Sequence, residues 1–196
     1  MSVSSFPQAD WLQTLSKSQP IAAEMLARSP EEQHRLGHFH TLREICQQPS
    51  TWIRTGELIQ QSAPALSHLI EGISSLTFSG SGSSDYAGDG VRMVLQRELD
   101  VHTRAIPGST LLTRGSAALA VGRPGLMVSL ARDLVLRRNR PGNLATTFQD
   151  DPKVKAITLD EPTNDKSLVM TSSFTNLVLA ARFLGLVGRD SLGTNT

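Results

Sequence analysis

The sequence predicts an α/β protein whose mostly parallel sheet follows a helical N-terminal segment, and three observations carry this prediction. Beyond Gly72, short segments with β-strand character alternate with segments of helical periodicity. The segment GLMVSLA, residues 125–131, is almost continuously apolar, which is typical of strands buried on both faces of a parallel sheet. From residue 21 to residue 72 the spacing of apolar residues is helical instead. We therefore expect helices to cover both faces of the sheet.

The helical lead-in has recognisable start and stop signals. At SPEEQ, Ser29 is a helix cap, Pro30 lies in the first turn and Glu32 can complete a capping box. We expect the next helical stretch to stop at Pro49, because proline cannot continue the backbone hydrogen bonding of a helix. The segment STWIRTGELIQQ then restarts a helix, with an apolar face that comprises Trp52, Ile53, Leu58 and Ile59. A last helix, ALSHLIEG, completes the lead-in.

The elements beyond Gly72 follow from composition and periodicity. We expect strands at SLTF, DVHTRAI, GLMVSLA and VKAITLD. We expect helices at YAGDGVRMVLQREL, within PGSTLLTRG, at PGNLATTF and at SFTNLVLAARFLGLVG, the last being buried and ending at Gly188. The predicted organisation is an N-terminal arm at 1–20, the helical lead-in at 21–72, the α/β domain at 73–188 and a polar tail at 189–196.

Composition narrows the classes of function. The 196 residues carry a net charge of +1, which provides no general basic field for binding nucleic acid. Cys46 is the single cysteine, so we expect a buried thiol and neither a disulfide nor a cysteine-based zinc site within one chain. No apolar run is long enough to span a membrane, and the first residues lack the pattern of a signal peptide. We expect a cytoplasmic protein that binds neither nucleic acid nor a membrane.

The loop SGSGSSD, which joins a predicted strand to a predicted helix, is the first candidate binding site. Unpaired amides and the helix dipole favour an anion at such a place, with freedom from Gly80 and Gly82 and hydroxyl donors from Ser81, Ser83 and Ser84. The loop matches neither a dinucleotide fingerprint, since Asp85 stands at the third glycine, nor a P-loop, since no lysine follows. Acidic side chains in the first helical turn either repel an anion or simply complement the dipole. A phosphate site and an ordinary turn therefore both remain open.

Three segments together resemble the sugar isomerase (SIS) domain family. SGSGSSDYAGDGVRMVLQREL is similar to the family's first loop and helix, and RRNRPGNLATTF resembles its Asn-x-Pro-Gly segment. DEPTNDKSLVMTSSFTNLVLAARFLG resembles the acidic-to-hydroxyl segment before the family's long buried helix. The lead-in TLREICQQPSTW is similar to the REI-x-x-QP lead-in of the branch with tagatose-6-phosphate ketose/aldose isomerases and the isomerase half of glucosamine-6-phosphate synthase.

The resemblance implies a flavodoxin-like three-layer sandwich that binds a phosphorylated sugar or amino sugar without a cofactor or metal. It also implies a ketose/aldose isomerase or a deaminase, or a shortened variant of one, and a homodimer. The substrate-binding positions that it implies are Gly82, Ser83, Ser84, Val169, Thr171, Ser172 and Ser173. The last three open the final helix, where they either donate to a ligand or cap that helix.

Two features depart from the family pattern. The family's main phosphate loop should follow GLMVSLA, yet residues 131–141 contain neither serine nor glycine, so the domain is expected to be shortened there. Only Arg132 and Asp133 separate this strand from LVL, too few for a crossover between parallel strands, which takes about a dozen residues. A basic cluster at this point either pairs with phosphate or lies in solvent, and it comprises Arg132, Arg137, Arg138 and Arg140. Members of this branch usually carry two SIS domains in tandem, whereas this sequence is expected to hold one at most.

Isomerisation needs a base, for which a desolvated carboxylate is suitable. Candidate carboxylates are Glu57, Glu98, Asp160 and Glu161. Glu161 is preferred, because it directly precedes the segment that is expected to line the sugar site. The pair in HFH, His38 and His40, is unsuited to a metal because the segment reads as helical. The alternative function is a non-catalytic phosphosugar-binding or interaction module.

Overall fold

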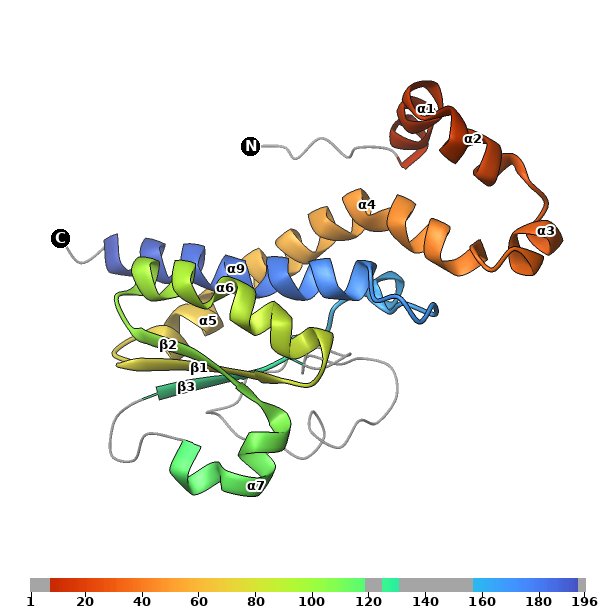
Figure 1. The fold of residues 1–196 in the computed structure, drawn as a ribbon. Coiled ribbons are helices and arrows are strands. Elements are labelled where there is room, and N and C mark those ends of the chain that lie inside the picture. The colour runs from red at the N-terminus through yellow and green to blue at the C-terminus, as the bar shows by residue number, and fades with distance from the viewer. Residues whose placement is uncertain (1–7, 119–124, 131–156, 194–196) are drawn as a thin grey trace.

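The computed structural model describes residues 8–118, 125–130 and 157–193 (Figure 1). The described elements are α1 Gln8–Ser18, α2 Pro20–Ala27, α3 Pro30–Arg35, α4 Phe39–Gln61, α5 Ala63–Ile70, β1 Ser75–Gly80, α6 Ser83–Leu99, β2 His102–Pro107, α7 Gly108–Ala118, β3 Gly125–Ser129, the 3₁₀ helix η1 Glu161–Thr163, and α9 Ser172–Gly193. No described helix has the combination of length and apolar content that crossing a membrane requires.

The described strands form a parallel sheet in the order β2-β1-β3. Ser75 of β1 is in register with His102 on one side and with Gly125 on the other. Helices α6 and α9 lie over one face of the sheet, and α7 lies on the opposite side (Figure 1). The prediction of an α/β fold with a parallel sheet is thus confirmed, and this strand order is that of flavodoxin-like sheets.

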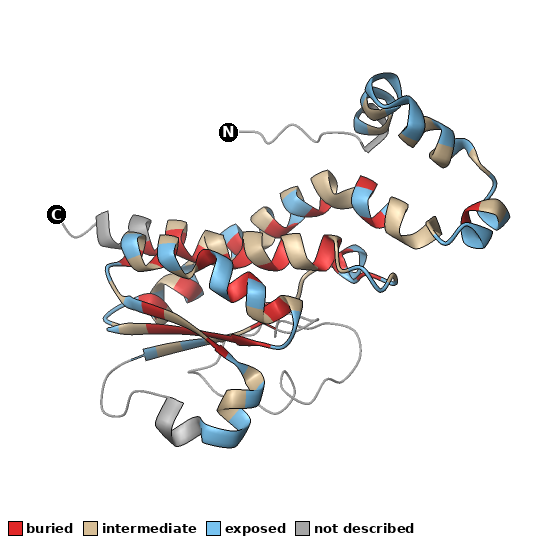
Figure 2. Ribbon diagram, in the orientation of Figure 1, coloured by how far each residue is buried: buried red, intermediate tan, exposed pale blue. Residues whose placement is uncertain are grey.

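The core lies between the sheet and the helices above it. Phe78 and Leu76 of β1 are buried together with Leu95 of α6 and Leu177 of α9. Ile59 of α4 belongs to the same cluster, and α4 and α5 pack against α9. Figure 2 shows the buried positions concentrated in these elements, whereas α1 to α3 are largely exposed. The second half of the lead-in therefore contributes to the core of the α/β body.

Helix α4 differs from its prediction, because it continues through Pro49 as one helix of 23 residues. Immediately after the proline, the hydroxyls of Ser50 and Thr51 donate to carbonyl oxygens of the preceding turn. Of the predicted apolar face, Ile59 is buried and Leu58 packs against the core, whereas Trp52 is exposed and Thr51 is buried in its stead. Packing against α9 therefore outweighs the cost of an internal proline.

Other expectations also needed correction. The strand predicted at VKAITLD is not found at residues 157–160, which have no regular secondary structure. Strand β3 is partly exposed rather than buried on both faces, since Met127 is 53% exposed. Helix α9 runs five residues beyond Gly188 to Gly193, and most of the predicted arm forms α1. The segment 131–141, the basic cluster and PGNLATTF lie outside the described residues.

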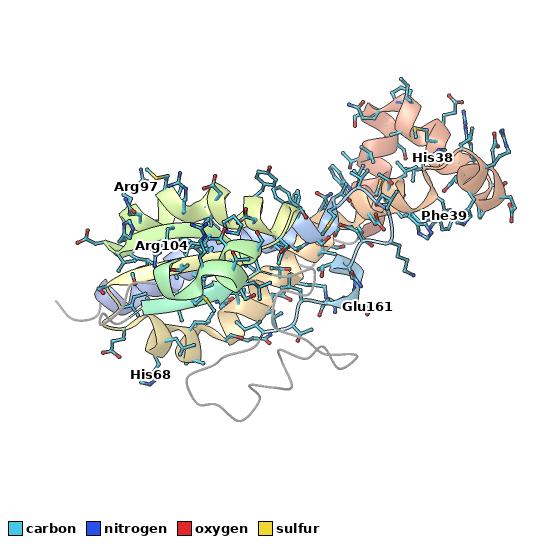
Figure 3. All side chains as sticks on the ribbon, turned by 60° about the horizontal axis from the view of Figure 1, so that its bottom comes forward. His38, Phe39, His68, Arg97, Arg104 and Glu161 are labelled. Carbon is cyan, nitrogen blue, oxygen red and sulfur yellow. The ribbon has the colours of Figure 1, made fainter. Side chains whose placement is uncertain are left out.

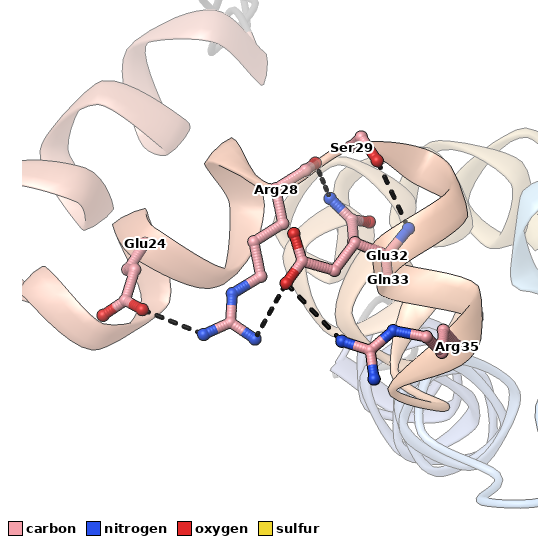
Figure 4. A network of polar contacts seen from close by, with 6 residues as sticks. All are labelled: Glu24, Arg28, Ser29, Glu32, Gln33 and Arg35. Carbon is pink, nitrogen blue, oxygen red and sulfur yellow. Dashed lines mark hydrogen bonds and ion pairs between the residues drawn. The ribbon is translucent and has the colours of Figure 1, made fainter.

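The N-terminal helices extend beyond the body at the start of α4 (Figure 1). Polar contacts hold the junction of α2 and α3 (Figure 4). The Ser29 hydroxyl accepts from the amide of Glu32 at 3.3 Å, so the predicted helix cap is confirmed. Arg28 pairs with Glu24 at 2.9 Å, and the side chain of Gln33 donates to the Arg28 carbonyl at 2.8 Å.

Candidate functional site

The candidate site starts at the turn from β1 into α6. Only Ser81 and Gly82 separate strand and helix, and Gly82 has a φ of +59°, which favours glycine. A Cβ atom on Gly80 would lie 2.7 Å from the carbonyl carbon of Ser84 and 2.8 Å from the carbonyl oxygen of Leu130. The glycines are therefore needed for the close approach of the α6 N-terminus to the ends of the strands.

Part of the donor set of this turn is used internally. The amides of Ser84 and Asp85 donate to the carbonyls of Ser81 and Gly82, at 3.3 and 3.0 Å. Within the described part of the chain, the amides of Gly82 and Ser83 and the hydroxyl of Ser84 donate to no acceptor. These groups, together with the Ser81 hydroxyl, remain available to donate to a ligand.

A distant segment of the chain meets this turn. The hydroxyl of Ser83 lies 3.1 Å from the thioether sulfur of Met170, which is a weak acceptor. Val169 is exposed, and Thr171 directly follows Met170. Gly108, where β2 meets α7, also lies close, since a Cβ atom there would be 3.2 Å from the Ser81 hydroxyl. The structure thus brings the two predicted substrate-binding segments together at the carboxyl ends of the strands, the usual place for ligands of open α/β sheets.

Two buried polar atoms on these segments have no hydrogen-bond partner. They are Oδ1 of Asp85, in the first turn of α6, and Oγ1 of Thr171, at the start of α9. A carboxylate oxygen accepts hydrogen bonds, and a hydroxyl can donate or accept. Because buried polar groups are normally paired, these atoms are available to hydroxyl or amino groups of a ligand or to water. From the sequence, Asp85 was notable only as a break in the glycine pattern and as an acidic residue in the first turn of a helix; its buried, unpaired oxygen is a tertiary feature.

The remaining predicted positions at the start of α9 are engaged. Asp165 accepts from the amides of Ser172 and Ser173 at 3.1 and 2.9 Å, and from the Ser173 hydroxyl at 2.5 Å. All three residues are buried. The sequence left open whether Ser172 and Ser173 cap the helix or bind a ligand. The contacts show that Asp165 caps the helix instead, and ligand binding by the two serines stays a prediction.

The carboxylates that the sequence offered as bases differ from Asp85 in exposure or in pairing. Glu161 lies in η1 and is exposed (Figure 3), so desolvation does not favour it as a base. Glu98 is paired with Arg182 through both oxygens, and Asp160 pairs with Arg54 at 2.5 Å. Of the described carboxylates in the segments that meet at this turn, Asp85 has a buried oxygen without a partner.

The histidines and the cysteine lie elsewhere. His38 and Phe39 are in the N-terminal part of the chain, away from the β1–α6 turn (Figure 3). The rings of His34 and Phe39 stack at 3.9 Å between centroids. Cys46 is buried, and burial raises the pKa of its thiol, so it is poorly suited to act as a nucleophile. Among the described residues, no three potential ligands form a metal site.

Comparison with known proteins identifies relatives, although no protein-family model matches the chain. The chain is 30% identical over 181 residues to the proposed D-galactosamine-6-phosphate deaminase AgaS of Streptomyces coelicolor, covering 78% of this chain and 47% of that protein. It is 26% identical over 184 residues to D-galactosamine-6-phosphate deaminase AgaS of a Shewanella species, covering 79% and 48%. The chain therefore spans about half the length of the curated relatives it matches.

Solved structures share the fold. A proposed tagatose-6-phosphate ketose/aldose isomerase from Clostridium novyi superposes with a TM-score of 0.72 at 22% identity, covering 87% of this chain and 50% of the other. The tagatose-6-phosphate ketose/aldose isomerase of Escherichia coli gives a TM-score of 0.66 at 22% identity, covering 76% and 50%. At this identity the likeness establishes the architecture.

Proposed function

This chain belongs to the sugar isomerase (SIS) domain family, and from that membership we propose that it binds a phosphorylated sugar or amino sugar where β1 meets α6. The observation that carries the proposal is the contact between Ser83 and Met170, which joins the β1–α6 turn to the segment before α9. Free amides and a free hydroxyl there suit an anion or sugar hydroxyls. The unpaired oxygens of Asp85 and Thr171 suit the hydroxyl or amino groups of the same ligand.

The relatives suggest the substrate class and the reaction type. Loss of ammonia from C2 of galactosamine 6-phosphate, with uptake of water, produces the ketose tagatose 6-phosphate. The names of the curated relatives and those of the similar solved structures therefore concern sugars with one carbon skeleton. We propose that the chain acts on such a ligand as an isomerase or deaminase. Such a reaction needs a base near C1 and C2, for which Asp85 is better buried than the predicted Glu161.

A non-catalytic binding module is the second candidate. The observation that favours it is that the buried carboxylates of Glu44 and Asp165 both accept hydrogen bonds from backbone amides. These hydrogen bonds engage both carboxylates in holding the backbone, which does not leave them free to act on a ligand. On this proposal the chain holds the sugar phosphate without converting it.

Calorimetry and product assays separate these candidates. We expect galactosamine 6-phosphate or tagatose 6-phosphate to bind with measurable heat, whereas galactosamine without phosphate should bind much more weakly. Release of ammonia from galactosamine 6-phosphate, or conversion of tagatose 6-phosphate to an aldose phosphate, would support the enzyme. Binding without turnover would support the binding module. If neither sugar phosphate binds, the proposed function is wrong.

Ser84→Ala is expected to weaken sugar-phosphate binding about tenfold, because it removes one donor to a charged ligand. The side chain of Ser84 is buried at the first turn of α6. The melting temperature without ligand should change little. Ser67→Ala, on α5, serves as the matched control and should bind normally. Equal affinity in the Ser84 variant and the wild type would remove this residue from the site.

Thr171→Val should affect stability and binding in opposite directions. The valine has a similar shape but lacks the buried, unpaired hydroxyl, so the free energy of unfolding is expected to rise by about 1 kcal/mol. Sugar-phosphate affinity is expected to fall about fivefold, because one hydrogen bond to the ligand is lost. Thermal denaturation and calorimetry on the same preparations measure both quantities. A variant with unchanged affinity would show that the hydroxyl does not face the ligand.

We also propose that the chain forms a homodimer. Helix α2, PIAAEMLA, is largely apolar yet has no buried residue. Exposed large apolar side chains occur in α2 and elsewhere in the N-terminal half of the chain, namely Trp11, Ile21, Leu36 and Ile45. Such a surface is expected to be covered by another protein surface. Sedimentation equilibrium should give twice the chain mass, and Ile21→Glu should shift the equilibrium toward monomer; a wild type that sediments as a monomer would contradict this proposal.

A further inference from the structure

We propose that Glu44 of α4 is a positioning residue for the sugar-phosphate site, because it fixes the segment 165–171 that faces the β1–α6 turn. This inference rests on the proposed function. Glu44 lies within the lead-in motif TLREICQQP, and the sequence alone predicted no role for its side chain. The structure shows what that carboxylate contacts.

Glu44 is buried, at 5% exposure, and accepts three hydrogen bonds from one short stretch of chain. Its Oε1 accepts from the amide of Lys166 at 2.5 Å and from the amide of Ser167 at 3.1 Å. Its Oε2 accepts from the Ser167 hydroxyl. A carboxylate can accept all three at once, because each oxygen offers two lone pairs and the group has no proton to donate.

The segment from 164 to 171 needs this support because it has no regular secondary structure. The amide of Asn164 donates to Glu161 in η1, but the amides of Lys166 and Ser167 have no helix or sheet partner and are paired by Glu44 instead. Asp165, near the start of this segment, pairs the amides of Ser172 and Ser173, which open α9 directly after it. Glu44 therefore holds the segment to α4, and Asp165 holds it to the start of α9, each through two successive amides and one serine hydroxyl.

Other side chains of α4 extend the same attachment. The side-chain amide of Gln47 donates to the Pro162 carbonyl at 2.6 Å. One turn further, Thr51 accepts from the side chain of Asn176 at 2.9 Å, and Thr55 donates to it at 2.7 Å. These residues share one helix face with Glu44, since they follow it at intervals of three or four residues. This polar face of α4 is aligned with the segment from η1 to the first turns of α9.

The anchored segment carries the groups that meet the β1–α6 turn. Met170 contacts Ser83, and the unpaired hydroxyl of Thr171 follows it. Between these residues and Glu44's partners lie only Leu168 and Val169, both exposed. A displacement of Lys166 and Ser167 therefore reaches Thr171 with no intervening secondary structure to absorb it. Because small misplacements of binding groups weaken binding, Glu44 should influence ligand affinity without touching the ligand.

Glu44→Gln tests the inference with little change in side-chain shape. Glutamine has one acceptor oxygen, and its NH₂ group opposes the donors of the segment. We expect the dissociation constant for galactosamine 6-phosphate, or for tagatose 6-phosphate if that ligand binds, to rise about tenfold. We also expect faster hydrogen exchange at the amides of Lys166 and Ser167. Glu71→Gln, at an exposed glutamate at the end of α5, is the control and should change neither quantity.

Ser167→Ala gives an independent test if Glu44→Gln folds poorly, because it removes one donor and leaves the carboxylate paired with both amides. It should raise the dissociation constant severalfold, measured well below the melting temperature. A purely structural role predicts a lower melting temperature with unchanged affinity, and that result in either folded variant would overturn the inference. A wild type that binds neither sugar phosphate overturns the proposed function and this inference with it. A wild type that binds, together with variants that bind equally well, overturns the inference alone.

Discussion

Replacing Gly80 by alanine is expected to destabilise the protein by about 3 kcal/mol and to abolish sugar-phosphate binding. The added methyl group would lie 2.7 Å from the carbonyl carbon of Ser84, 2.8 Å from the amide nitrogen of Asp85 and 2.8 Å from the carbonyl oxygen of Leu130. All three are backbone atoms, so no side-chain rotation relieves the clash. The strand end and α6 must separate instead, and this moves the donors of the β1–α6 turn.

Gly90→Ala is the control for the Gly80 variant, since a Cβ atom at Gly90 would contact nothing within 4 Å. Gly90 lies inside α6, where alanine is a better helix former, so a stabilisation of about 0.5–1 kcal/mol is expected. Urea denaturation and calorimetry of both variants measure the effects. If Gly80→Ala binds the ligand like the wild type, the close approach at this turn is not needed for binding.

Asp165→Ala should lower the free energy of unfolding by about 3 kcal/mol, the other large effect. Asp165 is buried and accepts from two amides and a hydroxyl at the start of α9. Removing it leaves buried donors unpaired at the N-terminus of a helix that packs on α4, α5 and α6. Ligand affinity should also fall, because Thr171 adjoins these donors.

Asp160→Ala provides the comparison, because Asp160 forms an ion pair with Arg54 whose two side chains are 36% and 61% exposed. Exposed pairs contribute little, so a loss below about 1 kcal/mol is expected. Chemical denaturation of both variants at neutral pH checks the difference. Equal losses in the two variants would mean that the network around Asp165 contributes no more than a surface pair.

The candidate site was predictable where backbone geometry depends on residue type. Gly80 and Gly82 marked a close approach between strand and helix, and the structure has one there. The pairing of this turn with the segment before α9 came from family resemblance alone, since 87 residues separate Ser83 from Met170. The hydrogen bonds from the amides of Ser172 and Ser173 to Asp165 were not predictable. Acidic and hydroxyl residues near the start of a helix are equally suited to capping the helix and to binding a ligand.

By itself, the sequence determined the parallel α/β class, the Ser29 cap and the position of the β1–α6 turn, because periodicity, capping residues and glycines act locally. Only the tertiary structure decided that α4 passes through Pro49 and that Glu44 and Thr51 are buried while Trp52 is 40% exposed, with its indole N–H donating to Thr175 of α9. The physical reason is that buried polar side chains need partners, and those partners, Ser167 and Asn176, lie more than 100 residues further along the chain.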